Sequence, residues 1–167
     1  LTNTRGMGAE EAAKITREVC HNLKQALAGF DRPVLFVSRS DSTLRGHYPV
    51  ETDVMAEELG PFDAHFLIPA FFEGGRVTMH STHYLRTGDK TVPVHETECA
   101  PDSVFGYPHS YLPKYVEEKT RGRIKADEVV LFPIEEMRAG CFDRLMTRTD
   151  NACFVVDAEQ QSDRDRF

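Results

Sequence analysis

The stretch Ala64–Pro69 (AHFLIP) is a short apolar run that follows the turn signal Gly60-Pro61. Such a run is typical of a strand buried on both faces, as the strands of parallel sheets are. Residues 33–38 (PVLFVS) have the same character, and so do residues 128–132 and 153–156. The sequence therefore predicts that these runs form the strands of one mainly parallel sheet.

Helical patterns alternate with these strands. Apolar residues recur every three to four positions over residues 9–28, and Gly29 ends the pattern. Pro49 suits the first turn of a second helix that runs to about Leu59, and a third helix is expected over residues 135–147. Strands that alternate with helices form right-handed βαβ units. We therefore expect an α/β fold in which helices sandwich a mainly parallel sheet.

Residues 76–95 break this alternation. Two β-prone runs, residues 76–85 and 91–94, flank the turn signal Thr87-Gly88-Asp89-Lys90. This pattern predicts a β-hairpin inserted into the α/β framework. The proline-rich residues 98–113 are expected to form a loop.

Composition limits the classes of partner. The 167 residues suit one domain, and 20 basic against 27 acidic residues give a net charge of -7. This charge argues against a nucleic-acid partner, although an acidic chain can still hold a basic pocket for an anionic small molecule. The sequence has no apolar run of membrane-spanning length and no signal-peptide pattern, so we expect no membrane partner and a cytoplasmic protein.

Neither the cysteines nor the histidines predict a metal site. The cysteines are scattered, without a CxxC pair, and are expected to be reduced thiols: Cys20, Cys99, Cys141 and Cys153. His80 and His83 lie three positions apart, which would place them on opposite faces of a strand. We therefore expect no metal ligand set in this chain.

The densest polar cluster, Ser38–Gly46 (SRSDSTLRG), directly follows a predicted strand. In open α/β sheets, ligands bind beyond the carboxyl ends of the strands. Arg39 and Arg45 can fork onto a carboxylate, and serine and threonine hydroxyls can bond a polyol. Asp41 can accept bonds from sugar hydroxyls or take a proton from one. Alternatively, the stretch is a solvated turn in which Asp41 and Ser42 cap the next segment.

Two further loops adjoin predicted elements. Residues 2–6 (TNTRG) precede the first helix and can bring Arg5 to the same sheet edge; alternatively, they form an N-cap with an exposed arginine. Residues 69–76 (PAFFEGGR) offer adjacent glycines and the candidate anion contact Arg76; alternatively, the glycines only make the turn into the hairpin. The sequence contains no GxxxxGK[ST], GxGxxG or GxSxG motif.

With these loops in view, the sequence resembles the four-carbon acid sugar kinase family, long catalogued as a domain of unknown function. The specific match is Asp41–Gly46 (DSTLRG). Weaker matches occur in the family's order and extend over nearly the whole chain: Thr4-Arg5, Pro69–Phe71, Gly75–Thr78, His83-Tyr84, Thr91–Val94 and Val155–Ala158. The chain departs from the family at Arg39, where lysine is frequent, and at Phe72, where proline is frequent.

The resemblance implies a division of labour between two domains. Family members hold the sugar acid in an N-terminal domain and ATP in a C-terminal domain, and they phosphorylate compounds such as threonate, erythronate and 3-oxo-tetronate. Residues 1–167 would then be a partial N-terminal domain, and ATP with Mg²⁺ would bind mainly outside it. The partners implied are the sugar acid and the C-terminal ATP-binding domain of the same chain, and the oligomeric state is left open, a homo-oligomer included.

The resemblance also gives a predicted site. By resemblance or by their place in the three loops, the substrate-binding residues are Thr4, Arg5, Arg39, Asp41, Ser42, Thr43, Arg45, Gly46 and Arg76. Asp41 is the candidate catalytic base. Two other hypotheses stay open at this point: a stand-alone sugar-acid-binding or sensor module without catalysis, and an unrelated α/β enzyme such as an aldolase or isomerase.

Overall fold

The computed structural model describes residues 2–167, which divide into two compact units. The first unit comprises the described residues up to Ser40 together with Gly46–Pro61. The second unit comprises Asp41–Arg45 and Phe62–Phe167.

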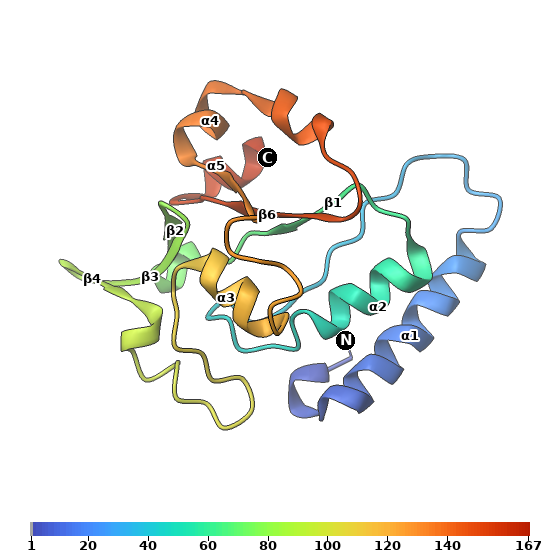
Figure 1. Cartoon of the computed structure of the whole chain (residues 1–167), viewed down its shortest axis with the longest axis horizontal. Coiled ribbons are helices and arrows are strands. Elements are labelled where there is room, and N and C mark those ends of the chain that lie inside the picture. Colours follow the sequence, from blue (N-terminus) through green and yellow to red (C-terminus); the bar gives the residue numbers. More distant parts are fainter. Residues whose placement is uncertain (1) are drawn as a thin grey trace. The chain divides into compact units, whose positions relative to one another are not determined.

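The first unit is a pair of helices, α1 (Ala9–Ala26) and α2 (Val50–Leu59), which lie side by side in Figure 1. Acidic residues in the first turn of α1 and Lys24 in its last turn complement the helix dipole. Arg17 joins the helices through ion pairs of 2.7 and 2.9 Å with the two glutamates near the end of α2. Both predicted helices are confirmed.

The predicted strand over residues 33–38 is wrong. This run forms no strand, and Leu35 and Val37 are 94% and 79% exposed. A strand needs a hydrogen-bonded neighbour, and the described strands pair among themselves in the orders β1-β6-β5 and β2-β3-β4. Apolar, β-branched composition therefore identified a β-prone segment, but the pairing that would make it a strand does not occur among residues 2–167.

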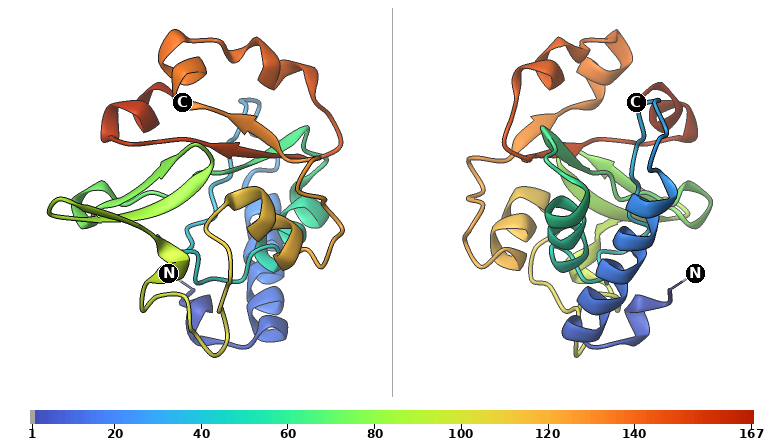
Figure 2. Two further views of the ribbon diagram at one scale, coloured as in Figure 1. Left: turned by 60° about the vertical axis from the view of Figure 1, so that its left-hand side comes forward. Right: turned by 90° about the vertical axis from the view of Figure 1, so that its right-hand side faces the viewer.

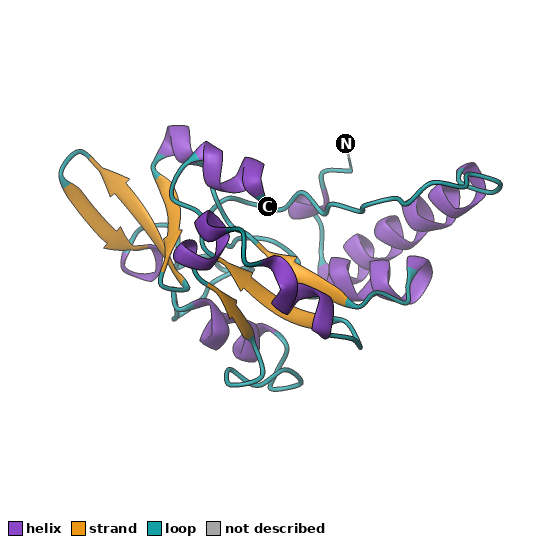
Figure 3. Cartoon of the chain, turned by 90° about the horizontal axis from the view of Figure 1, so that it is seen from above, coloured by secondary structure: helices purple, strands orange, loops and turns teal. Residues whose placement is uncertain are grey.

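The second unit is built on a parallel sheet. Its strands are β1 (Ala64–Leu67), β5 (Val130–Phe132) and β6 (Ala152–Val156), with β6 in the centre (Figure 3). Residues 153–156 of β6 are almost fully buried, as the continuous apolar run predicts for a strand covered on both faces. The three predicted parallel strands in this unit are confirmed.

Helices and apolar side chains complete the core of this sheet. Phe132, Met137, Phe154 and Val156 form a fully buried cluster. Met137 comes from α4 (Ile134–Ala139), which packs against α5 (Gln161–Arg166). The single helix predicted over residues 135–147 is divided, because Gly140 adopts a left-handed φ of 73° and residues 142–147 form a separate 3₁₀ helix. A further helix, α3 (Leu112–Lys119), was not predicted.

A second sheet is antiparallel and contains β2 (Arg76–Met79), β3 (Thr82–Thr87) and β4 (Lys90–Pro93), seen in Figure 2. The predicted hairpin turn at Gly88-Asp89 is confirmed. The prediction of one continuous run over residues 76–85 is wrong, because His80 and Ser81 have φ values of 48° and 58° and reverse the chain between β2 and β3. This left-handed pair, strained without glycine, was not signalled by the sequence.

Asp157, at the end of β6, supports that unusual turn. Its Oδ1 accepts a hydrogen bond of 2.8 Å from the backbone N–H of Ser81. Burial raises the pKa of the Asp157 carboxyl, and the hydrogen bonds from the Ser81 and His80 backbones oppose the rise. A backbone held in the left-handed region costs free energy, and hydrogen bonds to its amides offset part of that cost.

The architecture is thus α/β, with a parallel sheet, helices and an inserted antiparallel hairpin, as the sequence predicts. Among residues 2–167 there is no helix long and apolar enough to cross a lipid bilayer.

The capping carboxylate of α5 gives a first prediction. Asp163 is buried, and its Oδ2 accepts 3.1 Å bonds from the Glu159 and Gln160 amides. Arg138 donates a 2.9 Å bond to each of its two carboxylate oxygens. We expect Asp163→Asn to lower the free energy of unfolding by about 1–3 kcal/mol in urea titrations at neutral pH, because buried acceptors of charged donors are lost. Asp165→Asn, on the exposed side of the helix, is the matched control.

The same residue sets a pH dependence. Hydrogen bonds from Arg138 are the main cause of the lowered pKa of Asp163. The ionised carboxylate therefore stabilises the fold above the unfolded pKa of about 3.9, and that stability is lost as pH falls through the lower pKa of the folded state. Stability should decline less steeply on acidification in Asp163→Asn than in the wild type; equal slopes would contradict the assignment.

Candidate functional site

The predicted polar cluster contains a compact turn, Asp41–Arg45, which we call the Asp41 turn and which belongs to the second unit. A single oxygen, Oδ2 of Asp41, organises it. This atom accepts hydrogen bonds from the Thr43 amide (2.9 Å), the Thr43 hydroxyl (2.5 Å) and Nε of Arg45 (3.1 Å). Nε of Arg45 also contacts the Thr43 hydroxyl oxygen at 3.0 Å. The structure thus brings three of the predicted site residues together.

The carboxylate of Asp41 is ionised at neutral pH. Burial alone would raise its pKa, but hydrogen bonds from Thr43 and Arg45 outweigh burial and hold the pKa below the ordinary value of 3.8. A carboxylate with a lowered pKa is a weak base, since a general base works best with a pKa near the working pH. The surroundings of Asp41 therefore suit an orienting group better than a proton acceptor.

Arg45 is held through one edge of its guanidinium group. Only Nε is used in the contacts with Asp41 and Thr43, and within residues 2–167 the two Nη nitrogens have no hydrogen-bond partner. Its side chain is 26% exposed, so ligand can reach it from solvent. An arginine fixed through Nε and open at both Nη atoms can bind a carboxylate with paired hydrogen bonds.

A buried histidine supports the Asp41 turn from the hairpin. His83 on β3 is fully buried, and its Nε2 lies 2.8 Å from the backbone oxygen of Ser42. Its Nδ1 lies 3.0 Å from Oγ1 of Thr78 on β2. Burial is the main cause that lowers the pKa of His83 to about 4. His83 was not predicted to support this turn; its position in the matched His83-Tyr84 pair was the signal that could have pointed to this role.

The backbone of the turn is also held by Tyr115, which packs against Tyr107. The hydroxyl of Tyr115 on α3 donates a 3.1 Å bond to the backbone oxygen of Leu44, whose φ is 66°. The Tyr107 ring packs edge-on against Tyr115 with a centroid separation of 6.0 Å. The buried Tyr107 hydroxyl has no hydrogen-bond partner among residues 2–167, and burial raises its pKa strongly. These residues make the floor of the turn rigid and apolar.

The remaining predicted residues lie elsewhere in the described chain. Thr4, Arg5, Arg39 and Gly46 belong to the first unit, so their convergence with the Asp41 turn stays a prediction. Thr4 donates a 2.6 Å hydrogen bond to Glu51. In the second unit, Arg76 is engaged locally, because its Nη1 donates to the Gly74 carbonyl at 2.6 Å and its guanidinium lies over the Phe71 ring. A role for Arg76 in anion binding also stays a prediction.

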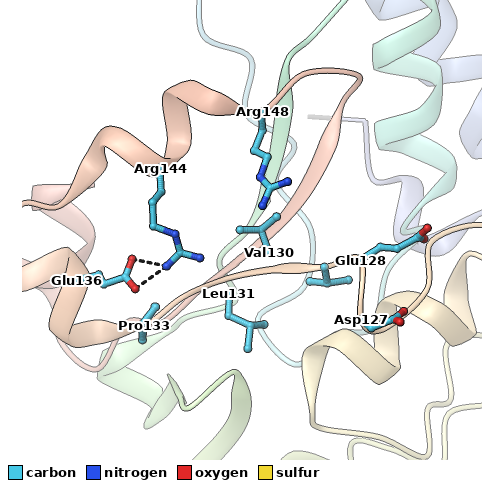
Figure 4. Close-up of a pocket in the computed structure, with 9 residues that line it drawn as sticks. Asp127, Glu128, Val130, Leu131, Pro133, Glu136, Arg144 and Arg148 are labelled. Atoms are coloured by element: carbon cyan, nitrogen blue, oxygen red, sulfur yellow. Dashed lines mark hydrogen bonds and ion pairs between the residues drawn. The ribbon is translucent and has the colours of Figure 1, made fainter.

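One hollow in the second unit lies away from the Asp41 turn. It follows the edge strand β5 and has a volume of about 610 Å³ (Figure 4). Arg144 forms an ion pair with Glu136 through hydrogen bonds of 2.5 and 2.7 Å, while the Arg148 side chain lies over Val130. This hollow is a broad, open surface trough without a fixed set of polar groups, and it has none of the features that organise the Asp41 turn.

No group of three histidine, cysteine, aspartate or glutamate side chains comes together in the part of the chain that the structure describes. None of the four cysteines forms a disulfide; Cys20, Cys99 and Cys153 are buried and Cys141 is exposed.

The fold and the Asp41 turn define an α/β domain with an anchored, partly exposed arginine. Comparison with protein families assigns the class of this domain. The whole of residues 1–167 matches the model of the sugar-binding N-terminal domain, and the chain belongs to that family.

Two curated relatives are sugar-acid kinases. The chain is 35% identical over 108 residues to the D-erythronate kinase of Heliobacterium modesticaldum, a match that covers 59% of this chain and 24% of the relative. It is 32% identical over 112 residues to the D-threonate kinase of Bordetella bronchiseptica, covering 67% of this chain and 25% of the relative. The matched part thus spans about a quarter of the length of these relatives.

Solved structures share the fold. A protein of Bordetella bronchiseptica described as a domain of unknown function, a domain-swapped dimer with bound citrate, is 28% identical and superposes with a TM-score of 0.68. That match covers 98% of this chain and 36% of the other. A Haemophilus influenzae protein superposes with the same TM-score at 19% identity, which supports the fold alone.

The contacts of Asp41 predict a measurable shift. We expect Arg45→Gln to raise the pKa of Asp41 above its wild-type value, because the substitution removes the charged donor that helps hold this pKa low. Carbon-detected NMR titration of the aspartate carboxyls measures it. Arg148→Gln, an exposed arginine at the β5 trough, is the control and should leave the Asp41 titration unchanged. An unchanged Asp41 pKa in Arg45→Gln would refute the described arrangement.

Proposed function

We propose that this chain is the substrate-binding part of an ATP-dependent kinase that phosphorylates a four-carbon sugar acid of the threonate, erythronate or 3-oxo-tetronate type. The observation that carries the proposal is Arg45, fixed through Nε by Asp41 and open at both Nη atoms. The curated relatives named as D-erythronate kinase and D-threonate kinase support the same substrate class.

In this proposal, Arg45 recognises the carboxylate of the sugar acid. Two parallel charge-assisted hydrogen bonds give both affinity and a fixed orientation. Asp41 keeps the guanidinium in place, and Ser42 at the surface of the turn offers a hydroxyl to the polyol. Thr43 is buried and uses its hydroxyl inside the turn, so it acts by fixing the shape of the turn.

The phosphoryl donor belongs to another part of the protein in this proposal. ATP with Mg²⁺ binds mainly outside residues 1–167, in a C-terminal domain of the same chain, as the resemblance to the four-carbon acid sugar kinases implies. The task of the sugar-binding part is to place one hydroxyl in line with the donor, and such positioning supplies a large share of the rate in phosphoryl transfer. Thr4, Arg5, Arg39, Gly46 and Arg76 complete the substrate site.

The base that takes the hydroxyl proton is a separate question. Asp41 stays the candidate within this chain, but its lowered pKa argues for the orienting role. We further propose a cytoplasmic location, and a homo-oligomer as the working assembly; the domain-swapped dimer formed by a solved relative supports the latter.

Steady-state kinetics of the complete kinase test the role of Arg45. We expect Arg45→Gln to lower kcat/KM for threonate or erythronate by about 10- to 100-fold, the effect of losing charge-assisted hydrogen bonds to a carboxylate. Arg148→Gln should keep the wild-type value. The neutral polyol threitol should be a poor ligand of the wild-type protein, and the preference for acid over polyol should narrow in Arg45→Gln. Full turnover of sugar acids by Arg45→Gln would overturn the site.

Calorimetry tests the division of labour. Titration of residues 1–167 with threonate, erythronate and Mg²⁺–ATP should show heat for a sugar acid and none for the nucleotide. Tight ATP binding to this chain alone would contradict the proposed arrangement. Sugar-acid binding by a complete protein that turns over no ATP would instead identify a binding or sensor module.

A further inference from the structure

We propose that His83 is a positioning residue of the sugar-acid site, which holds the Asp41 turn through a hydrogen bond from its Nε2 to the backbone oxygen of Ser42. The effect on catalysis rests on the proposed function. The contact itself rests on the geometry of the second unit alone.

The contacts form one chain across the hairpin. The Pro69 carbonyl oxygen lies 2.8 Å from Oγ1 of Thr78, which lies 3.0 Å from Nδ1 of His83, and Nε2 of His83 lies 2.8 Å from the Ser42 oxygen. Thr78 and His83 face each other in the β2–β3 register, and both side chains are fully buried. Water does not reach these groups, so their hydrogen bonds have to be satisfied among themselves.

The number of available protons decides which of these contacts are hydrogen bonds in each tautomer of His83. Both ends, the Pro69 and Ser42 carbonyl oxygens, can only accept, so three hydrogen bonds need three protons. The Thr78 hydroxyl supplies one proton and a neutral imidazole supplies one. One contact of the three is therefore left without a proton as long as His83 is neutral.

The two tautomers place that deficit at different contacts. In both, the Thr78 hydroxyl donates to the Pro69 carbonyl oxygen. With the proton on Nε2, His83 donates to the Ser42 oxygen, and the contact between Nδ1 and the Thr78 hydroxyl lacks a proton. With the proton on Nδ1, the imidazole donates to the Thr78 hydroxyl oxygen, and the lone pair of Nε2 faces the Ser42 oxygen at 2.8 Å. Only the first arrangement gives the Asp41 turn a hydrogen bond from His83.

The imidazole stays neutral under working conditions. Burial lowers the pKa of His83 to about 4, the charge of Arg76 lowers it further, and the Ser42 and Val77 carbonyls and the Asp41 carboxylate oppose the decrease. The choice is thus between tautomers rather than between charge states.

The hairpin gives the imidazole a firm base. Thr78 exchanges two backbone hydrogen bonds with Ala158, of 2.9 and 3.0 Å, and the His83 amide donates a 2.9 Å bond to the Ser110 carbonyl. The backbone at both Thr78 and His83 is therefore held in place by these hydrogen bonds. The Asp41 turn is a short loop segment, so a bond from a rigid partner reduces the number of shapes it can take.

Nitrogen NMR on unligated protein tests the contact directly. We expect His83 in the wild type to show a protonated Nε2 and an unprotonated Nδ1 at neutral pH, because only a proton on Nε2 can reach the Ser42 oxygen. The amide resonances of Thr43 and Arg45 should shift in His83→Leu. A wild-type imidazole protonated on Nδ1 would overturn the proposal.

Kinetics of the complete kinase separate positioning from simple stabilisation. We expect His83→Leu to raise the KM for the sugar acid about tenfold, as for one lost buried hydrogen bond, with the KM for ATP unchanged. His83→Gln places an amide donor at similar reach and should recover most of the affinity. His80→Asn, in the exposed turn of the same hairpin, is the control.

The outcomes are distinguishable. Equal losses in His83→Leu and His83→Gln, or a rise in both KM values that follows the loss in melting temperature, would mean that His83 only stabilises the fold, and would overturn the proposal. Absence of sugar-acid turnover by the wild type would refute the proposed function instead, while the NMR result would still decide whether His83 holds the Asp41 turn.

Discussion

The carboxyl end of β6 is the constraint on which the second unit depends. Its last residues are buried in the core, and the two residues that follow bind the hairpin: Asp157 accepts the Ser81 amide, and Ala158 pairs with Thr78 through both backbone groups. These few bonds attach the antiparallel sheet to the parallel one. They also fix the orientation of the β2–β3 pair, from which His83 reaches the Asp41 turn. Parallel sheets bind ligands at this end of their strands, and here the same end also supports the loop that would bind one.

The buried charge of Asp41 is compensated within the Asp41 turn. One carboxylate oxygen receives the amide and hydroxyl of Thr43 and the Nε of Arg45, which offsets the cost of burying Asp41. Because Asp41 accepts a hydrogen bond from Nε of Arg45, the guanidinium group already has a fixed orientation in the absence of a ligand. Preorganisation of this kind reduces the entropy lost on binding. The same hydrogen bonds that make Asp41 a good support for Arg45 also make it a poor base, so the two roles oppose each other in this residue.

Much of this molecule could be predicted from the sequence, and the failures have physical causes. Continuous apolar runs identified β1, β5 and β6, because strands covered on both faces leave that pattern. Polar density after a predicted strand drew attention to Asp41, Thr43 and Arg45, which the structure joins by hydrogen bonds, while their role in binding stays a prediction. The turn at His80-Ser81 was missed because its left-handed backbone is stabilised by Asp157, far away in the sequence. His83 was missed for a similar reason, since its partner Ser42 is an acceptor on the main chain and leaves no trace in residue identity.

The apolar run over residues 33–38 has a practical consequence for anyone who produces this chain. Leu35 and Val37 are almost fully solvent-exposed in a segment of high β-propensity and no internal charge, the combination that promotes intermolecular strand pairing. Arg32 and Arg39 border the run and act as charged gatekeepers against such pairing. Self-association should therefore depend on ionic strength, because salt screens the charges of these two arginines. Concentrated protein is best kept at low salt concentration, and its light scattering should rise as salt is added.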